Sequence, residues 1–338
     1  MASRLTPEKT QATPVWGGEV LQHIDWTQPW FQPWAEIGEP VSKEAVDKKS
    51  VAQALNRYKR PMSNRHLEST TSQQPSPAVQ RGWGAGLADL ASEASMRPNS
   101  APPSLNEAVE EVVPAVASQT AQVNEQSQPV YIQFVNQSEL PPEQPYEAFI
   151  FQQQKVPTRD GLHDFFNGLC WQRFPTSKHR LNQLQAQEIA KQGIGSTRGA
   201  VRDALTLFDE NAVLWQGPDV LWQALQARDW FKLFVELREQ WLHVHMVLFG
   251  HALLEKLVTP YKSITGHVYR VRTDVPPHDD AALDAWVAQD LQTDKLATKP
   301  FEPLPVLGVP NWWADNAAPA FYQDTQVFRP KRRPASQY

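Results

Sequence analysis

A sharp change of composition divides the chain and limits how it can fold. Ser, Gln, Pro, Ala and Glu dominate residues 59–128, where Trp83 is the only aromatic residue. Such a segment buries too little apolar surface to offset the cost of ordering the backbone, about 1–2 kcal/mol per residue. We therefore expect a long disordered insertion at 59–128. Residues 16–58 and 129–330 then form a single globular domain, flanked by a flexible N-terminus (1–15) and a basic tail (331–338).

Tryptophan is abundant outside the insertion, with 13 in the chain, and several lie in the segment WGGEVLQHIDWTQPWFQPW. Pro29 and Pro33 interrupt this segment, so it cannot form one long helix. Large aromatic side chains contribute much buried area. We expect an irregular arm that packs on the core, and the alternative is a stacking surface for a partner protein.

The remaining segments alternate between helical and strand patterns. Apolar residues from Leu162 recur at helical spacing, which predicts a helix to about Phe174, with Asp160 as its N-cap. Strands are expected in PVYIQFV (129–135), in LTLF and AVLW on either side of a hairpin loop at Asp209–Asn211, and in ITGHVYRVR (264–272). Further helices are expected at 219–227, 229–240, 248–258 and 280–291. The predicted fold class is α+β, predominantly helical, with a small antiparallel sheet.

Charge and cysteine content restrict the compartment and the partners. The net charge of −5 gives no overall attraction to nucleic acid or to anionic membranes, so nucleic acid is an unlikely partner. No apolar run reaches the roughly 18–20 residues that span a bilayer. A single cysteine, Cys170, excludes an internal disulfide, and the first ten residues lack the apolar core of a signal peptide. We expect a cytoplasmic protein with no membrane association, and the insertion could bind a protein partner.

A divalent metal is the cofactor that the ionisable residues suggest. His251 and Glu255 are four residues apart on a predicted helix and face the same way, so they can offer a nitrogen and a carboxylate oxygen to one ion. His163, Asp209 and Glu210 could complete such a site. The alternative is a simple hydrogen bond within the helix.

Basic and amide side chains suggest an anion-binding function. The candidates for substrate binding are Arg159, Asn167, Lys178, Arg198 and Arg202. Guanidinium groups match phosphate or carboxylate groups with two hydrogen bonds. Asp203 and its acidic neighbours explain the same residues as internal ion pairs.

A cysteine protease is a weaker alternative, with Cys170 and His251 as the reactive pair. Cys170 lies well inside a predicted helix on its apolar stripe, away from the helix N-terminus that would lower the pKa of a thiol. We therefore expect a buried structural thiol.

Several motifs resemble a bacterial family described as domain of unknown function 3025. They are VPTRDGLHDFFN, WQRFPTSKHRLN, RGAVRDALTLFDEN, FGHALLEKL, LPVLGVPNWWADN and FYQDTQVFRP. The resemblance implies one family domain outside the insertion but no established reaction. Ala212 and Asn311 stand where the family pattern leads us to expect glycine, and both positions could require a positive φ.

These patterns together predict a polar centre for the domain. His163, Asp203, Asp209 and Glu210 are the candidate catalytic residues, and His251 and Glu255 are the candidate metal ligands. The enzyme class that fits is a metal-assisted hydrolase. The competing hypothesis is a non-enzymatic binding or scaffold protein that uses the tryptophan-rich arm and the insertion.

Overall fold

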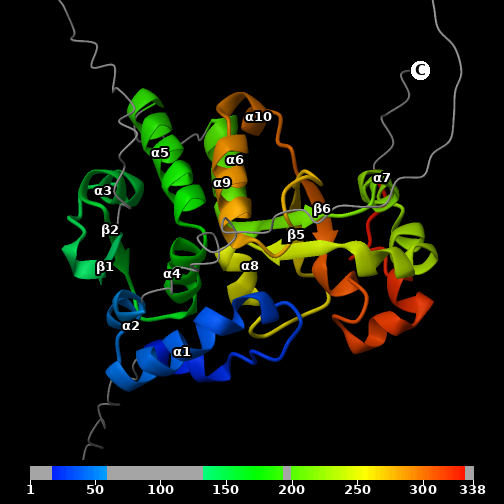
Figure 1. The fold of residues 1–338 in the computed structure, drawn as a ribbon, viewed down its shortest axis with the longest axis horizontal. Coiled ribbons are helices and arrows are strands. Elements are labelled where there is room, and N and C mark those ends of the chain that lie inside the picture. The colour runs from blue at the N-terminus through cyan, green and yellow to red at the C-terminus, as the bar shows by residue number, and fades with distance from the viewer. Residues whose placement is uncertain (1–16, 59–131, 193–198, 332–338) are drawn as a thin grey trace, which may run out of the picture. The chain divides into compact units, whose positions relative to one another are not determined.

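The computed structural model describes residues 17–58, 132–192 and 199–331 (Figure 1). The α-helices are α1 (Gln32–Lys48), α2 (Val51–Arg57), α3 (Tyr146–Gln153), α4 (Leu162–Arg173), α5 (Pro175–Gln192), α6 (Ala200–Asn211), α7 (Asp219–Ala227), α8 (His251–Lys256), α9 (Asp280–Asp290) and α10 (Thr293–Ala297). The strands are β1 (Gln133–Asn136), β2 (Lys155–Thr158), β3 (Ala212–Gln216), β4 (His245–Leu248), β5 (Thr265–Arg270) and β6 (Glu302–Pro305). Short irregular helices are η1 (Gly17–His23), η2 (Gln137–Glu139), η3 (Lys232–Glu236), η4 (Arg238–His243), η5 (Val306–Gly308), η6 (Ala314–Ala317) and η7 (Pro319–Gln323).

The strands form two small sheets. β1 and β2 pair in parallel, and the second sheet has the order β4-β3-β5-β6. Within the larger sheet β3 runs antiparallel to β4 but parallel to β5, and β5 runs antiparallel to β6. The prediction of an α+β, mainly helical fold with a small sheet is confirmed, whereas the sheets are mixed and not purely antiparallel.

Strand β3 is central because its sequence is apolar on both faces. Its first four residues, AVLW, are all buried, and Val213 lies opposite Leu248 on β4 and Val268 on β5. A continuous apolar run is typical of a strand that is covered on both sides. Helix α6 leads directly into β3, so the end of this helix is fixed against the middle of the sheet.

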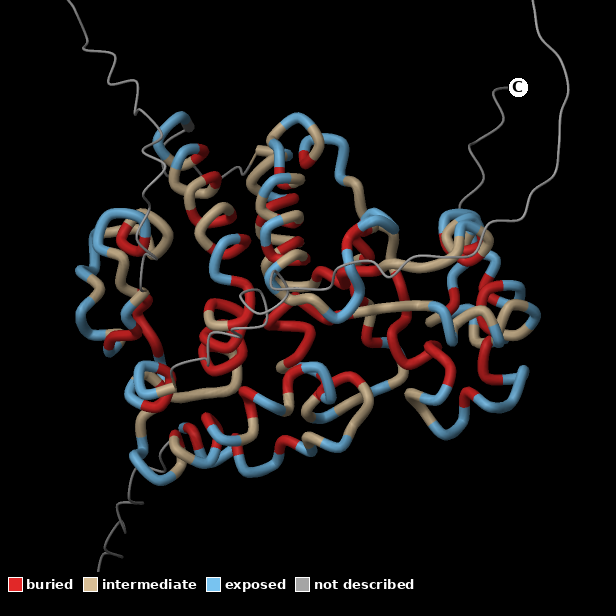
Figure 2. The backbone as a smooth tube through the Cα atoms, in the orientation of Figure 1, coloured by how far each residue is buried: buried red, intermediate tan, exposed pale blue. Residues whose placement is uncertain are grey.

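Helix α4 is the most deeply buried helix near the candidate site. Nine of its 12 residues are buried, among them Phe165, Phe166 and Leu169. Figure 2 shows the burial of the backbone in the orientation of Figure 1. α4 contacts α5 and α8, and α8 also contacts α6. Side chains from all four helices can therefore meet around one point.

The tryptophan-rich arm packs into the core, as expected. Trp30 and Trp34 are buried, and the indole nitrogen Nε1 of Trp34 donates a hydrogen bond to the carbonyl oxygen of Leu248 on β4 (3.1 Å). Trp26 packs against Phe31 and Phe165. These side chains are consequently part of the interior, not a free stacking surface.

The predicted hairpin at Asp209–Asn211 is wrong. These residues form the last turn of α6, and the chain passes straight into β3 at Ala212. Ala204, Leu205 and Phe208 are the buried residues of α6, and they follow helical spacing. The LTLF segment is therefore helical, and three polar residues end a helix where we expected a loop.

Other boundaries differ locally. The expected helix over 248–258 is shorter because Leu248 ends β4, and α8 begins at His251. The expected helix over 229–240 is irregular, since η3 is a π-helical segment that is followed by η4. Gly161, not Asp160, is the N-cap of α4, and Asp160 accepts a hydrogen bond from the backbone of Val51 (2.8 Å).

The two positions that departed from the family pattern behave differently. Asn311 has a φ of 69°, in the left-handed region that asparagine tolerates. Ala212 has a φ of −68°, so alanine is not strained there.

None of the helices in the described segments is long and apolar enough to cross a membrane.

Candidate metal site

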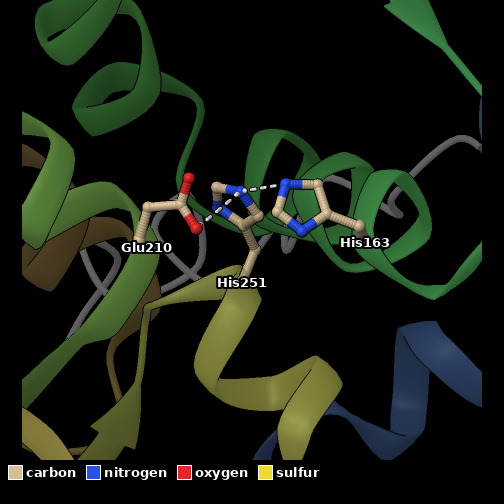
Figure 3. A group of neighbouring side chains, drawn as sticks. All are labelled: His163, Glu210 and His251. Atoms are coloured by element: carbon tan, nitrogen blue, oxygen red, sulfur yellow. Dashed lines mark hydrogen bonds and ion pairs between the residues drawn. The ribbon is translucent and has the colours of Figure 1, made fainter.

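Three side chains from three different helices point toward one another. His163 is the second residue of α4, Glu210 lies in the last turn of α6, and His251 is the first residue of α8 (Figure 3). One ligand atom from each residue can be chosen so that all three lie within 4.8 Å of one another. Two imidazole nitrogens and a carboxylate oxygen are a donor set that suits Zn²⁺ and similar divalent ions.

A close backbone approach places α8 beside the end of α6. A Cβ atom added at Gly250 would lie 2.5 Å from the backbone atoms of Asn211 and from the carbonyl oxygen of Glu210. Only glycine allows this separation, and it brings His251 next to the last turn of α6. The glycine therefore sets the geometry of the candidate site.

Each histidine directs Nε2 to the common point and Nδ1 to a carboxylate. The Nε2 atoms of His163 and His251 are 3.1 Å apart, and His251 Nε2 is 3.9 Å from Glu210 Oε2. His163 Nδ1 is 2.8 Å from Glu255 Oε2, whereas His251 Nδ1 is 3.9 Å from Asp209 Oδ2. Histidine ligands of metals usually donate from the other ring nitrogen to a carboxylate, a backbone carbonyl or water. His163 has such a partner in Glu255, whereas the buried Nδ1 of His251 makes no hydrogen bond within the described segments.

Burial differs between the two sides of the site. The side chain of His251 is 5% exposed, whereas those of His163, Glu210 and Glu255 are about one third exposed. Burial lowers the pKa of His251 to about 4, so its imidazole is neutral at pH 7. Burial, together with the nearby Asp209, raises the pKa of Glu210. The site thus has a buried floor and an open face that solvent can reach.

Asp209 connects this site to a buried ion pair. Its Oδ1 atom is 2.5 Å from Lys178 Nζ, and Lys178 also donates to the Asn167 side chain (2.8 Å). Burial alone would raise the pKa of Asp209, but the charge of Lys178 and its hydrogen bond contribute most to the opposing effect, and the net pKa is lowered. The Asn167 amide nitrogen donates to the hydroxyl of Tyr146 (3.1 Å).

A small cavity borders this network on the side of α3 and α5. Lys178, Asn167 and Asp209 line it, together with Glu147 and Asn182. Its accessible space holds about one water molecule. The cavity is consequently too small for an organic substrate in this conformation.

Sequence reasoning missed several residues of this cavity, among them Glu147 and Asn182. Asn182 donates hydrogen bonds to the side chain (2.6 Å) and backbone (2.8 Å) of Glu147. Burial, followed by the charge of Asp209, raises the pKa of Glu147 to about 6. Lys178, Asn182 and Gln185 follow i, i+4, i+7 spacing, and this polar stripe on α5 was the available signal.

The structure brings most of the predicted polar centre together. His163, Asn167, Asp209, Glu210, His251 and Glu255 are joined through the contacts above. Asp203 is exposed on α6, six residues before Asp209 and about 120° away around the helix axis. Asp203 therefore does not face the other candidates.

The predicted anion-binding residues do not form one cluster. Arg159 forms a two-pronged ion pair (both 3.0 Å), but its partner is Asp164 and not Asp203 or the acidic neighbours of Asp203. Lys178 is buried against Asp209. Arg202 lies on α6 and its Nε atom has no hydrogen-bond partner in the described segments, whereas Arg198 lies outside them.

Cys170 is a structural thiol. It is fully buried on α4, its sulfur donates to the carbonyl oxygen of Phe249 (3.1 Å), and burial raises its pKa to about 12. A thiolate nucleophile is strongly disfavoured in such an environment.

The chain belongs to the family described as "Protein of unknown function (DUF3025)". The family model matches residues 132–332, which contain every residue of the candidate metal site. This confirms the resemblance inferred from the motifs. No curated protein and no solved structure matches the chain.

Proposed function

We propose that His163, Glu210 and His251 bind a divalent metal ion and that the protein is a metal-assisted hydrolase. The observation that carries this proposal is the pair of Nε2 atoms 3.1 Å apart, with Glu210 beside them and Glu255 on Nδ1 of His163. Two ligands bound tetrahedrally at about 2.1 Å lie about 3.4 Å apart. The Nε2 atoms would have to separate by about 0.3 Å and Glu210 Oε2 to approach His251 Nε2 by about 0.5 Å, and all three ligand atoms already lie within 4.8 Å of one another.

The count of donors and acceptors on the two rings favours an ion between the histidines. Without an ion, one Nε2 has to donate its proton to the other. If His163 donates from Nδ1 to Glu255, then His251 must donate from Nε2 and turn an unprotonated Nδ1 toward the carboxylate of Asp209. With an ion, both Nε2 lone pairs bind it and both Nδ1–H groups face carboxylates.

A metal-free arrangement also satisfies the geometry. A doubly protonated His163 could donate to both Glu255 and His251, since burial keeps His251 neutral. That arrangement places a fixed positive charge on His163 and needs no ligand. Measuring bound metal therefore separates the two states.

The remaining residues would have distinct roles in hydrolysis. An ion held here would lower the pKa of a bound water and polarise a carbonyl or phosphoryl group. Glu255, assigned above as a metal ligand from its spacing, fits better as the carboxylate that orients His163. It bonds Nδ1, across the ring from an ion at Nε2, so it would act through His163 and not directly on a bound water. Asp209, fixed by Lys178, would hold His251 in position.

Metal binding can be measured directly. The full-length protein is stripped with EDTA, titrated with Zn²⁺ and Mn²⁺ by calorimetry, and analysed for metal content after dialysis. We expect one ion per chain and a higher melting temperature. Replacing one ligand in His251→Asn or Glu210→Gln should weaken binding at least tenfold, whereas Glu239→Gln, which changes an exposed glutamate of η4, should not.

Hydrolysis needs its own test. The loaded protein and the Glu255→Gln variant are assayed against carboxylic ester, amide and phosphoester probes. Metal-dependent turnover that Glu255→Gln reduces while the ion stays bound supports the assignment. Absence of specific metal binding to the wild-type protein would reject it.

The second candidate, a scaffold or protein-binding function, rests on the insertion at 59–128, which lies outside the described residues. Deleting the insertion should abolish recovery of a partner if this proposal holds, and should leave the melting temperature nearly unchanged.

We further propose a reducing compartment such as the cytoplasm, because the one cysteine is buried and unpaired.

A further inference from the structure

A second cavity lies at the opposite end of α8 from His251. It has a volume of about 330 Å³, and its lining comes from the arm, from the end of α8 and from the loop before η6. The aromatic residues of the lining are Trp30, Phe31, Trp312 and Trp313. We call this space the tryptophan cleft. Its size is at the lower end of the range for small-molecule pockets.

Two of the tryptophans form one continuous wall. The rings of Trp30 and Trp312 are 6.0 Å apart and inclined at 56°. Trp312 follows Asn311, the residue with a φ of 69°, so a left-handed turn presents the indole to the cleft. Aromatic faces carry negative electrostatic potential and attract cations.

Asp25 adds a full negative charge to the lining. Its carboxylate accepts hydrogen bonds from the backbone and hydroxyl of Thr27 (3.0 and 2.6 Å) and from the Gln28 side chain (2.7 Å). These bonds lower the pKa of Asp25. Three bonds leave acceptor capacity on a carboxylate. No basic side chain of the described segments pairs with Asp25, and none lines the cleft.

A polar atom in the wall is also without a partner. Trp30 is 2% exposed, and its Nε1–H group makes no hydrogen bond within the described segments. A buried donor without an acceptor costs roughly 1–3 kcal/mol. The Nε1 atom of Trp30 has less than 1 Å² of accessible surface, so a ligand oxygen would reach it only after a shift of the Trp30 ring.

We propose that the tryptophan cleft binds a small organic cation of the quaternary ammonium class that carries a hydroxyl or carbonyl group. The partly exposed Trp312 and Trp313 would contact the methyl groups, Asp25 would balance the charge, and Trp30 would donate to the ligand oxygen after a shift of its ring. This site is separate from the candidate metal site, and its existence does not depend on the proposed function.

Calorimetric titration with choline chloride tests the proposal, with sodium chloride at equal ionic strength as the reference. The neutral analogue 3,3-dimethylbutan-1-ol has the same shape without the charge. We expect saturable binding of choline and about fivefold weaker binding of the alcohol, the difference that a cation–π contact supplies.

Three variants locate the ligand in the cleft. Asp25→Asn should weaken choline binding about fivefold while its oxygen still accepts from Thr27. Trp312→Leu should abolish binding. Asp47→Asn removes the same charge from an exposed position of α1 and should have no effect. Melting curves verify that each variant is folded.

Three results would overturn the proposal. The first is no saturable binding of choline to the wild-type protein up to about 20 mM, a concentration far above the dissociation constant expected for a built pocket. The second is equal binding of the alcohol, which would mark an apolar cleft only. The third is binding of a trimethyl-lysine peptide without binding of choline, which would assign the cleft to a protein partner.

Discussion

Replacing Gly250 with alanine should destabilise the protein through one steric contact. The added Cβ would lie 2.5 Å from the backbone of Asn211 and from the carbonyl oxygen of Glu210, whereas ordinary contact begins at 3.4 Å. The first turn of α8 would have to move by about 0.9 Å, because the atoms that it meets are backbone and cannot rotate away. Overpacking of this kind costs about 1–3 kcal/mol.

Gly161 offers a matched control within the same chain. Both glycines are N-cap residues with extended backbones, at φ values of −62° for Gly250 and −178° for Gly161. No atom lies within 4 Å of a Cβ built at Gly161. Effects on the unfolded chain and on capping are therefore similar in the two variants. The difference between their free energies of unfolding thus reports the contact with α6.

Urea unfolding of both variants measures this difference. We expect the free energy of unfolding to fall by about 1–3 kcal/mol more for Gly250→Ala than for Gly161→Ala. Equal values would refute the inference that a close approach of α8 to α6 sets the site. Metal affinity should also fall in Gly250→Ala alone, since His251 would move away from Glu210.

Three further outcomes follow from the polar network and the core. Lys178→Met should lower the free energy of unfolding by about 3 kcal/mol in urea titrations, because Asp209 would stay charged and buried without its partner; a loss below about 1 kcal/mol would contradict a buried pair. The pKa of Glu147 is raised to about 6, so the folded state holds its proton more tightly than the unfolded state, and stability should fall as the pH rises from about 4.5 to 6. Glu147→Gln should remove about 1 kcal/mol of this change in stability with pH. This is about half of what the full pKa shift would give, because the side chain is partly exposed and solvent screens its charge. Cys170 should react with a thiol reagent at pH 7 only after unfolding, and fast labelling of the native protein would show that the helix α4 core opens readily.

Local patterns predicted those parts of the fold where one period dominates. The apolar stripe of Leu162–Phe174 gave α4 nearly to the residue, and the strand at 264–272 and the helix at 280–291 are present as β5 and α9. These segments bury one clear face, so sequence spacing and tertiary packing favour the same structure.

The end of α6 shows why other segments could not be predicted. Asp209, Glu210 and Asn211 carry a turn-like composition between two apolar runs, which favours a loop on local grounds. In the folded chain Asp209 pairs with Lys178, and Glu210 faces His251, so contacts with distant residues stabilise the last helical turn. Residue patterns within one segment do not identify such distant partners.

Contacts between distant residues also explain why the candidate ligands differ from the predicted pair. His251 and Glu255 share a helix face, and their spacing alone suggested a shared ion. His163, 88 residues before His251, lies between them in space and accepts or donates at both of its nitrogens. Periodicity identifies the face of each helix but not which faces meet.

The packing of the arm has a practical consequence for anyone who expresses this protein. The family model begins at residue 132, yet Trp34 reaches a carbonyl of β4 and Leu55 fills the space above Gly168 on α4. A fragment cut at the family boundary would expose these apolar surfaces to water and would be prone to aggregate. Residues 17–58 belong in any expressed fragment, although they precede the matched region.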